Sequence, residues 1–301
     1  MPLYDKEELA KFKLSGKILR ETREEMRGLV HENMPIIEVC EKAEGLIRQK
    51  GGQPAFPCNV SINEVAAHYT SPPNDKSIIP PRSVVKVDIG VHVDGYVTDT
   101  AFTACFNPEF RTMVDTAEIA LKAAIETVAA DVSTGKIGGV IENTIKNRGF
   151  RPIQNLTGHS VGRYLIHAGT SIPNIRQVTF TKFKTGDVFA IEPFVTVVDA
   201  GGAVEDYPQK TILRLQKPKS AKTPNGKKLL KHIEEHFHTL PFAERWLQGV
   251  LPKEQHSEAM KELFATKGIM GYPVFVEVTR KTVAQAEHTV LVKEDGCEVL
   301  T

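Results

Sequence analysis

Cysteine is scarce in this chain of 301 residues. The four cysteines lie far apart, and no C-x-x-C pair occurs among them: Cys40, Cys58, Cys105 and Cys297. This spacing argues against a disulfide framework and against a structural zinc site, and it favours a reducing compartment. We therefore expect a cytoplasmic protein.

Long apolar runs and an excess of charge are also missing. No apolar segment reaches the roughly 20 residues that a membrane-spanning helix needs, and the charged N-terminus MPLYDKEELAKFK lacks the core of a signal peptide. The formal net charge is +1, so overall charge predicts no nucleic-acid partner and no membrane partner. No solenoid repeat or low-complexity tract occurs. The length suits one large or two ordinary globular domains.

One stretch, residues 84–105, has the pattern of a β-hairpin. Apolar and polar residues alternate on both sides of Asp94-Gly95, which is a preferred pair for a tight two-residue turn. Such a turn sets the register of the two strands, in which Val93 pairs with Tyr96, Gly90 with Asp99 and Asp88 with Ala101. Asp88 and Asp99 then share one sheet face, as diagonal neighbours about 7–8 Å apart at the backbone.

These two aspartates repel each other unless a cation lies between them. They could belong to a solvated outer face. However, the flanking valine, isoleucine and alanine residues indicate central strands, where an unpaired carboxylate is costly. Gly90 also leaves room beside them. Asp88 and Asp99 are therefore better interpreted as metal ligands.

Outside the hairpin, the periodicity predicts a mixture of helices and strands. Helix signals occur in four segments: residues 3–30, 36–50, 112–130 and 136–148. Residues 54–73 are expected to be irregular, residues 183–198 to form a turn and one strand, and residues 275–296 to form a strand pair. Residues 201–270 look helical and polar-faced, without strand alternation, which predicts a helical insertion.

Five side chains in or beside apolar, strand-like segments are candidate metal ligands: Asp88, Asp99, His159, Glu192 and Glu287. A buried glutamate is more often paired with Arg or Lys, but the segment FAIEPF around Glu192 contains neither. His159 alone would more often be a satisfied loop histidine. Together, four carboxylates and one imidazole form a hard, oxygen-rich set that suits Mn, Fe or Co and can hold two ions.

At these residues the chain resembles a known family, the methionine aminopeptidases of type II. Six stretches carry a resemblance that covers nearly the whole chain: PAFPCNVSINEVAAHYT, VDIGVHVDGYVTDTA, LTGHSVGRYLIHAG, FAIEPF, HTLPFAERWL and VAQAEHT. The long insertion between Glu192 and Glu287 is a feature of type II. Because no long N-terminal extension is present, the chain resembles the archaeal subgroup.

The resemblance implies an α+β pita-bread fold. In this fold, helices lie outside a curved, mainly antiparallel sheet with two pseudo-symmetric halves. Residues 1–200 and 271–301 would form this metallopeptidase domain, and residues 201–270 would form the helical insertion subdomain.

The resemblance also implies a role for each candidate ligand. Asp88 would hold the first of two divalent ions (Co, Mn, Fe(II) or Zn), His159 and Glu192 would hold the second, and Asp99 and Glu287 would bind both. Water activated between the ions would attack the carbonyl of the N-terminal methionine. Glu192 would accept the proton from that water.

Two further histidines match the family's substrate-contacting residues. His68 would contact the scissile nitrogen, and His167 would contact the carbonyl oxygen as charge develops on it. His68 by itself could also be a surface-loop imidazole. The methionine pocket should be apolar, because a thioether makes dispersion contacts. The motif positions assign five residues to its walls: Phe56, Ile166, Phe194, Tyr272 and Phe275. Each of these residues could also be plain core.

The implied activity is removal of the N-terminal methionine from nascent proteins and peptides, preferentially before a small second residue. The expected partners are the N-termini of nascent polypeptides, and transient association with the ribosome is also considered. The expected oligomeric state is a monomer. Two other functions stay open. A proline-specific peptidase such as a prolidase usually carries a separate N-terminal domain, and only about 80 residues precede the hairpin. A non-catalytic binding protein of this fold would have lost ligands that this chain keeps.

One motif departs from the family pattern. Family members usually read Q-F-E-H-T where this chain reads Gln285-Ala286-Glu287-His288-Thr289. Because side chains alternate along a strand, Ala286 and His288 should lie on the face opposite Glu287. The missing ring should therefore affect packing behind the sheet and leave the metal ligands in place.

Overall fold

The structure is a computed structural model that describes residues 4–301. Leu3, the expected start of the first helix, lies outside the described residues. The four predicted helices are confirmed to within a few residues, and two more follow later in the chain: α1 (Lys6–Leu29), α2 (Ile36–Gln49), α3 (Arg111–Thr127), α4 (Thr134–Asn147), α5 (Pro224–Phe237) and α6 (Lys253–Ala265). No helix within the described range is long and apolar enough to cross a membrane.

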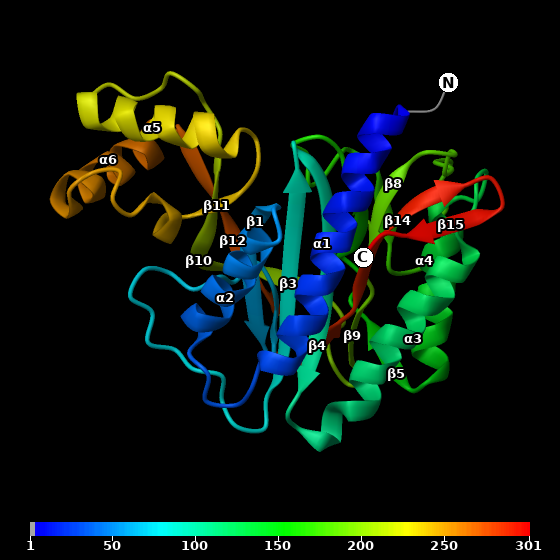
Figure 1. Cartoon of the computed structure of the whole chain (residues 1–301). Helices are drawn as coiled ribbons and strands as arrows, with labels where there is room; N and C mark the ends of the chain where they lie inside the picture. Colours follow the sequence, from blue (N-terminus) through cyan, green and yellow to red (C-terminus); the bar gives the residue numbers. More distant parts are fainter. Residues whose placement is uncertain (1–3) are drawn as a thin grey trace.

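A large curved sheet forms the centre of the molecule (Figure 1). Its strands follow the order β1-β3-β4-β14-β8-β6-β7, with β15 beside β14, and its pairs are antiparallel. The strands have these bounds: β1 (Gln53–Ile62), β3 (Val84–Val93), β4 (Tyr96–Cys105), β6 (Thr157–Ser160), β7 (Ser171–Pro173), β8 (Val188–Ile191), β14 (Glu287–Lys293) and β15 (Gly296–Val299).

Two smaller antiparallel sheets complete the fold. One has the order β11-β10-β12-β2 and the other the order β13-β9-β5. Their strands have these bounds: β2 (Val65–Ala67), β5 (Phe150–Pro152), β9 (Phe194–Val197), β10 (Val204–Leu215), β11 (Phe242–Ala243), β12 (Ile269–Glu277) and β13 (Val283–Gln285).

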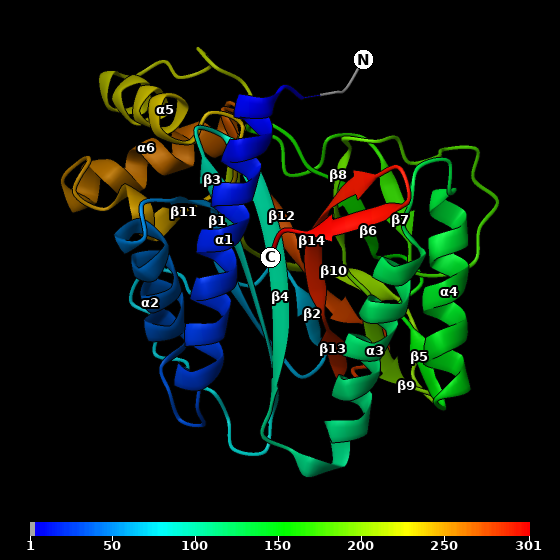
Figure 2. The ribbon, with the colours of Figure 1, turned by 45° about the vertical axis from the view of Figure 1, so that its right-hand side comes forward.

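Two helix pairs cover the outer side of the large sheet, as Figures 1 and 2 show. Helices α1 and α2 pack on β1, β3 and β4, whereas α3 and α4 pack on the other half. Each pair buries its apolar stripe in a separate core, one around Leu19 and Val87 and one around Ile141 and Val290. This layering confirms the α+β class, and it leaves the inner face of the curved sheet free for a site.

The predicted hairpin is confirmed residue by residue. Val93 pairs with Tyr96, Gly90 with Asp99, and Asp88 with Ala101. Asp94 and Gly95 both have positive φ, at 51° and 89°, as a tight turn of the primed type requires. The two aspartates therefore lie on one face of β3 and β4.

The prediction that residues 54–73 are irregular is wrong, because most of this segment belongs to β1 and β2. Pro54 and Pro57 made this strand difficult to recognise from the sequence. Proline has no backbone N–H and is confined to sheet edges and bulges. Here β1 lies at the end of the strand order, and its register shifts occur between Pro54 and Phe56 and between Phe56 and Asn59.

Residues 204–215 also differ from the prediction. They form the long strand β10, which pairs with β12, so the helical part of the expected insertion is limited to α5, α6 and the short 3-10 helix Glu244–Leu247. The stretch from Glu205 to Lys210 is exposed at every position, so it has no alternation of apolar and polar residues to reveal it. Helices α5 and α6 lie side by side at one end of the molecule, away from α1 to α4 (Figures 1 and 2).

Two strand predictions were too simple. Residues 183–198 form two strands, β8 and β9, which Glu192-Pro193 separates and which join different sheets. Residues 275–296 contain the end of β12, then β13 and β14. In each case the chain leaves one sheet for the next at a short break inside an apolar run, which periodicity alone does not detect.

Candidate active site

The five candidate ligands come from five strands that are neighbours in the large sheet. In sheet order, β3 carries Asp88, β4 carries Asp99, β14 begins with Glu287, Glu192 follows the last residue of β8, and β6 carries His159. Alternation along the strands points all five side chains to the inner face, where they line one cavity. Residues up to 199 positions apart thus meet because neighbouring strands bring them into line.

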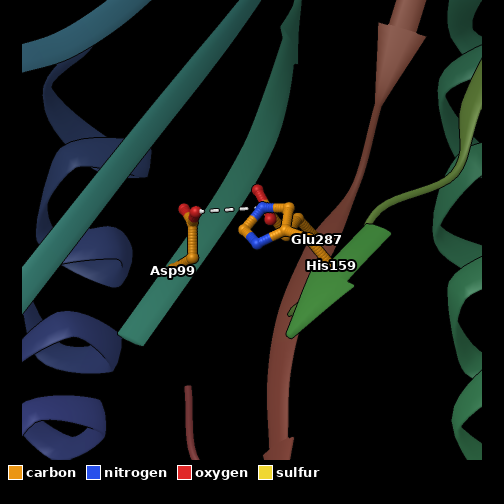
Figure 3. Close-up of side chains that lie close together, drawn as sticks. All are labelled: Asp99, His159 and Glu287. Carbon is orange, nitrogen blue, oxygen red and sulfur yellow. Dashed lines mark ion pairs between the residues drawn. The ribbon is translucent and has the colours of Figure 1, made fainter. Parts of the chain in front are cut away.

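The atoms of this cluster lie within metal-binding distances of one another. One ligand atom each from Asp99, His159 and Glu287 falls within a mutual distance of 4.8 Å, and these side chains converge in Figure 3. His159 Nε2 lies 3.7 Å from Asp99 Oδ2 and 3.3 Å from Glu192 Oε1. The imidazole therefore stands between carboxylates contributed by β4 and by the end of β8.

These polar groups are buried and poorly satisfied. Asp99, His159 and Glu287 are 4%, 6% and 1% exposed. Within residues 4–301, Asp88 Oδ1, Asp99 Oδ1 and both carboxylate oxygens of Glu287 have no hydrogen-bond partner. Buried polar atoms are nearly always paired, so a set of unpaired oxygens on one cavity wall fits the binding of a cation.

The pKa values indicate the same partner. Burial first, then repulsion from Glu192, raises the pKa of Asp88 to about 8, and burial raises the pKa of Glu192 to about 8. Burial and the neighbouring carboxylates hold the pKa values of Asp99 and Glu287 well above their usual range. Burial lowers the pKa of His159 to about 4, so this imidazole is neutral at pH 7, as a metal ligand must be. The donor set fits hard divalent cations.

Neighbouring groups fix the ligands in place. The backbone N–H of Asp99 donates to Thr289 Oγ1 at 2.8 Å, and Gln285 Nε2 lies 3.4 Å from Glu192 Oε2. The buried side chain of Asn174 donates from Nδ2 to the carbonyl oxygens of Leu156 and Glu192, both at 3.0 Å. Asn174 thus joins the backbone near His159 to the backbone that carries Glu192.

A cavity of about 350 Å³ opens beside the cluster. All twelve residues that the sequence singled out line it: Phe56, His68, Asp88, Asp99, His159, Ile166, His167, Glu192, Phe194, Tyr272, Phe275 and Glu287. A volume of this size is typical of a small-molecule or side-chain site. One wall is carboxylate-rich and the remaining walls are largely aromatic and aliphatic.

The two predicted substrate histidines lie at the cavity wall in different settings. His68 is half-buried, with Nδ1 3.2 Å from the carbonyl oxygen of Pro273, and its ring centroid lies 4.5 Å from that of Phe275. His167 is exposed, and its ring centroid lies 4.4 Å from that of His159. Burial lowers the pKa of His68 to about 4, so the ring is neutral at pH 7. Because Nδ1–H donates to the Pro273 carbonyl oxygen, Nε2 is the unprotonated nitrogen and can accept a hydrogen bond or a proton.

The sequence did not single out seven other lining residues: Asn59, Ala67, Asn155, Leu156, Thr157, Ile212 and Pro241. Leu156 and Thr157 open the stretch LTGHSVGRYLIHAG that contains His159, and their closeness to this candidate ligand in the sequence could have marked them. Ile212 and Pro241 come from the segment expected to be a helical insertion. That segment therefore contributes to the cavity wall. Pro241 lies in the stretch HTLPFAERWL, which carried the resemblance, whereas no local pattern marks Ile212.

Ala286, the residue that departs from the family pattern, lies on the face opposite Glu287, as the alternation along the strand predicted. Ala286 is buried in the core under α3 and α4, together with Val195 and Ile191. His288 faces the outer side, where its Nδ1 lies 2.8 Å from Arg23 Nη1 and 3.0 Å from Thr301 Oγ1. Glu287 points to the inner face between them, so the register around this ligand is confirmed.

A curved antiparallel sheet with buried carboxylates and an imidazole on its inner face is typical of a metal-dependent hydrolase. A model of metallopeptidase family M24 matches residues 10–294. The chain belongs to this family.

Within that family the similarity is to methionine aminopeptidases, as the motifs predicted. The chain is 44% identical over 290 residues to the methionine aminopeptidase of Methanothermobacter thermautotrophicus, covering 95% of this chain and 96% of that protein. It is 41% identical over 288 residues to that of Pyrococcus horikoshii (95% and 97% covered) and 38% identical over 297 residues to that of Saccharolobus solfataricus (98% of each covered). The resemblance to archaeal members of this group is thus confirmed.

Solved structures confirm the pita-bread fold. Methionine aminopeptidase from Thermotoga maritima superimposes with a TM-score of 0.73 at 21% identity, covering 100% of this chain and 99% of that one. A thermophilic Arx1 gives a TM-score of 0.81 at 18% identity, with 98% and 91% covered. The prolidase from Pyrococcus furiosus gives 0.62 at 18% identity, and the alignment covers 99% of this chain but 64% of that one. At these identities the likeness concerns the fold alone.

Proposed function

We propose that this chain removes the N-terminal methionine from nascent proteins and peptides, preferentially before a small second residue, with two divalent metal ions. The observation that carries the proposal is the set of five ligands from neighbouring strands facing one largely apolar cavity. The near full-length similarity to archaeal methionine aminopeptidases supports it.

In this proposal the five ligands share the two ions. Asp88 would bind one ion, His159 and Glu192 would bind the other, and Asp99 and Glu287 would bind both. The convergence of Asp99, His159 and Glu287 supports a common centre. The unpaired oxygens on Asp88, Asp99 and Glu287 supply the acceptors that two hard cations need.

The remaining chemistry is assigned to this chain's own side chains. When bound, two divalent ions lower the pKa of water and polarise a carbonyl. Glu192 would take the proton from the attacking water. His167 would donate to the carbonyl oxygen as negative charge develops on it, and His68 would contact the scissile nitrogen. The positions of both imidazoles on the wall of the same cavity support these roles.

The apolar walls would hold the methionine side chain. Phe56, Ile166, Phe194, Tyr272 and Phe275 line the cavity beside the ligands. An unbranched thioether makes favourable contacts with aromatic rings. The preference for a small second residue rests on the resemblance to the family.

The same proposal covers the cellular setting. The chain would act in the cytoplasm as a monomer on nascent N-termini, with transient ribosome association. Residues 201–270 would form an insertion subdomain on the domain built from residues 1–200 and 271–301. The contribution of Ile212 and Pro241 to the cavity supports a role for this insertion in shaping the substrate site.

A series of short peptides tests the specificity. The metal-loaded chain should release methionine from Met-Ala-Ser and Met-Pro-Ser, and much more slowly from Met-Lys-Ser and Met-Phe-Ser. It should release nothing from Leu-Ala-Ser. Equal rates on all five peptides would contradict the methionine and small-residue preferences. Cleavage restricted to a peptide such as Leu-Pro would instead support a proline-specific peptidase.

A further inference from the structure

Asn59 is a buried polar residue of the cavity that the proposed chemistry does not use. It lies on β1 directly opposite Asp88 in the pairing of β1 with β3. Residues opposite each other in an antiparallel pair point to the same face, with Cβ atoms about 4.5–5.5 Å apart. Asn59 is 3% exposed and lines the same cavity as Asp88. Its side chain therefore stands next to the outermost carboxylate of the ligand row.

The orientation of the Asn59 amide is fixed by the backbone. Its Nδ2 donates to the carbonyl oxygen of Pro57 at 3.0 Å. Turning the amide over would place two acceptor oxygens against each other, so this assignment follows from the hydrogen bond. As a result, Oδ1 is a buried acceptor that has no partner within residues 4–301.

The surroundings define the donor that would satisfy this oxygen. Asp88, which lies opposite Asn59 and lines the same cavity, is an acceptor in its ionised form and so does not supply that donor. An amino group suits such a place because it brings several N–H donors and, when protonated, a positive charge. An aminopeptidase must recognise one such group in every substrate, the free α-amine at the N-terminus.

We propose that Asn59 Oδ1 accepts a hydrogen bond from the α-amino group of the substrate and makes the free N-terminus a condition for binding. This inference rests on the proposed aminopeptidase function. It adds a specificity-determining residue outside the metal ligands and the two histidines. The amide would select the amine, while the apolar walls select the side chain.

Competitive inhibition tests the proposal with two ligands that differ only in the amine. L-Methionine carries the α-amino group, and 4-(methylthio)butanoate lacks it. The ratio of their inhibition constants reports the contribution of the amine in the metal-loaded protein. We expect Asn59→Ala to reduce this ratio about tenfold or more, as for the loss of a hydrogen bond to a charged group. Binding of 4-(methylthio)butanoate should change little.

Ser61→Ala is the matched control. Ser61 lies two residues further along β1 and has a buried hydroxyl without a partner among the described residues, but it does not line the cavity. This variant should keep the parent ratio. If Asn59→Ala fails to fold, Asn59→Leu retains most of the volume without an acceptor and should show the same loss.

Three results would overturn the role of Asn59. The ratio could stay at the parent value, both ligands could weaken equally, or bound metal could fall in step with the ratio, which would assign Asn59 to the metal site. Release of methionine from Met-Ala-Ser by the parent chain is measured alongside. Release together with an unchanged ratio contradicts the role of Asn59 alone. Absence of both release and L-methionine binding contradicts the proposed function as well.

Discussion

The ring of Phe56 lies against the backbone of Gly90, so closely that a Cβ atom at position 90 would come within 2.2 Å of Phe56 Cε1. Phe56 and Gly90 are paired between β1 and β3, and Gly90 is paired with Asp99 in the hairpin. Because Gly90 has no side chain, the Phe56 ring, which lines the cavity, can lie close to the candidate ligand Asp99.

We predict that Gly90→Ala pushes the Phe56 ring into the cavity. Catalytic efficiency for methionine release should fall about tenfold to a hundredfold, because small displacements at a site have effects of that size. Steady-state kinetics on Met-Ala-Ser measures this change. Gly45→Ala is the control, since nothing lies within 4 Å of a Cβ atom at that position of α2. Parent-like kinetics for Gly90→Ala would show that the ring is not constrained there.

Asp99→Asn should abolish nearly all activity while the chain stays folded. The change keeps the shape of the side chain but removes the charge that both ions would share. Peptidase assays at saturating metal, together with metal analysis, measure the effect. Asp94→Asn is the control, because this aspartate of the hairpin turn is 64% exposed at the side chain and an asparagine tolerates its positive φ. More than a few per cent of parent activity in Asp99→Asn would refute the bridging role.

Ala286→Phe should destabilise the fold and leave the metal centre intact. Ala286 is buried in the core under α3 and α4, and overpacking a filled core costs about 1–3 kcal/mol. Metal affinity and methionine release should stay within a few-fold of the parent, because the new ring lies on the face opposite Glu287. Urea unfolding and metal titration check the two parts. Loss of metal binding in a folded variant would contradict the register around Glu287.

Arg245 should be important for stability. It joins the segment before α6 to α2 and to the residues after His68, through an ion pair with Glu44 and hydrogen bonds to Thr70 Oγ1 at 2.9 Å and the Ser71 carbonyl oxygen at 3.0 Å. Arg245→Met should cost about 3–5 kcal/mol of unfolding free energy, because it removes the cation paired with the buried Glu44 carboxylate, which keeps the donors Trp246 Nε1 and the Cys58 backbone N–H.

The control for Arg245 is an exposed ion pair. Arg280 contacts Glu205 at 2.7 Å, and both side chains are half-exposed. Arg280→Met should change the unfolding free energy by about 1 kcal/mol or less. Denaturant titration of both variants measures the difference. Equal effects in the two variants would mean that the buried pair contributes no more than a surface one.

The metal-ligand candidates could be found from the sequence because each is a polar residue in or beside an apolar, strand-like segment. The Asp-Gly turn also gave the register of β3 and β4, which fixed the shared face of Asp88 and Asp99. Their convergence with His159 and Glu287 required the order of the strands in the sheet, and that order is a long-range property that periodicity does not contain. The resemblance to a family implied in advance that these residues share a metal centre, but it did not give the order of the strands.

Other parts of the site could not be predicted, for identifiable reasons. Pro54 and Pro57 obscured β1, so the position of Asn59 opposite Asp88 had no visible signal. The exposed first half of β10 obscured the strand that brings Ile212 to the cavity. In both cases the strand depends on a bulged or irregular pairing, which tertiary contacts stabilise against a weak local pattern.

Metal-dependent release of N-terminal methionine is the activity that the site and the similarities support for this chain. Its most direct test is release of methionine from Met-Ala-Ser by chelator-treated protein, before and after addition of Mn, Fe(II), Co or Zn, with bound metal measured in the same samples. We expect no release from the metal-free protein and recovery with at least one of these ions, at up to two ions per chain. Undiminished release without metal, or a folded, metal-loaded chain that releases no methionine, would contradict it.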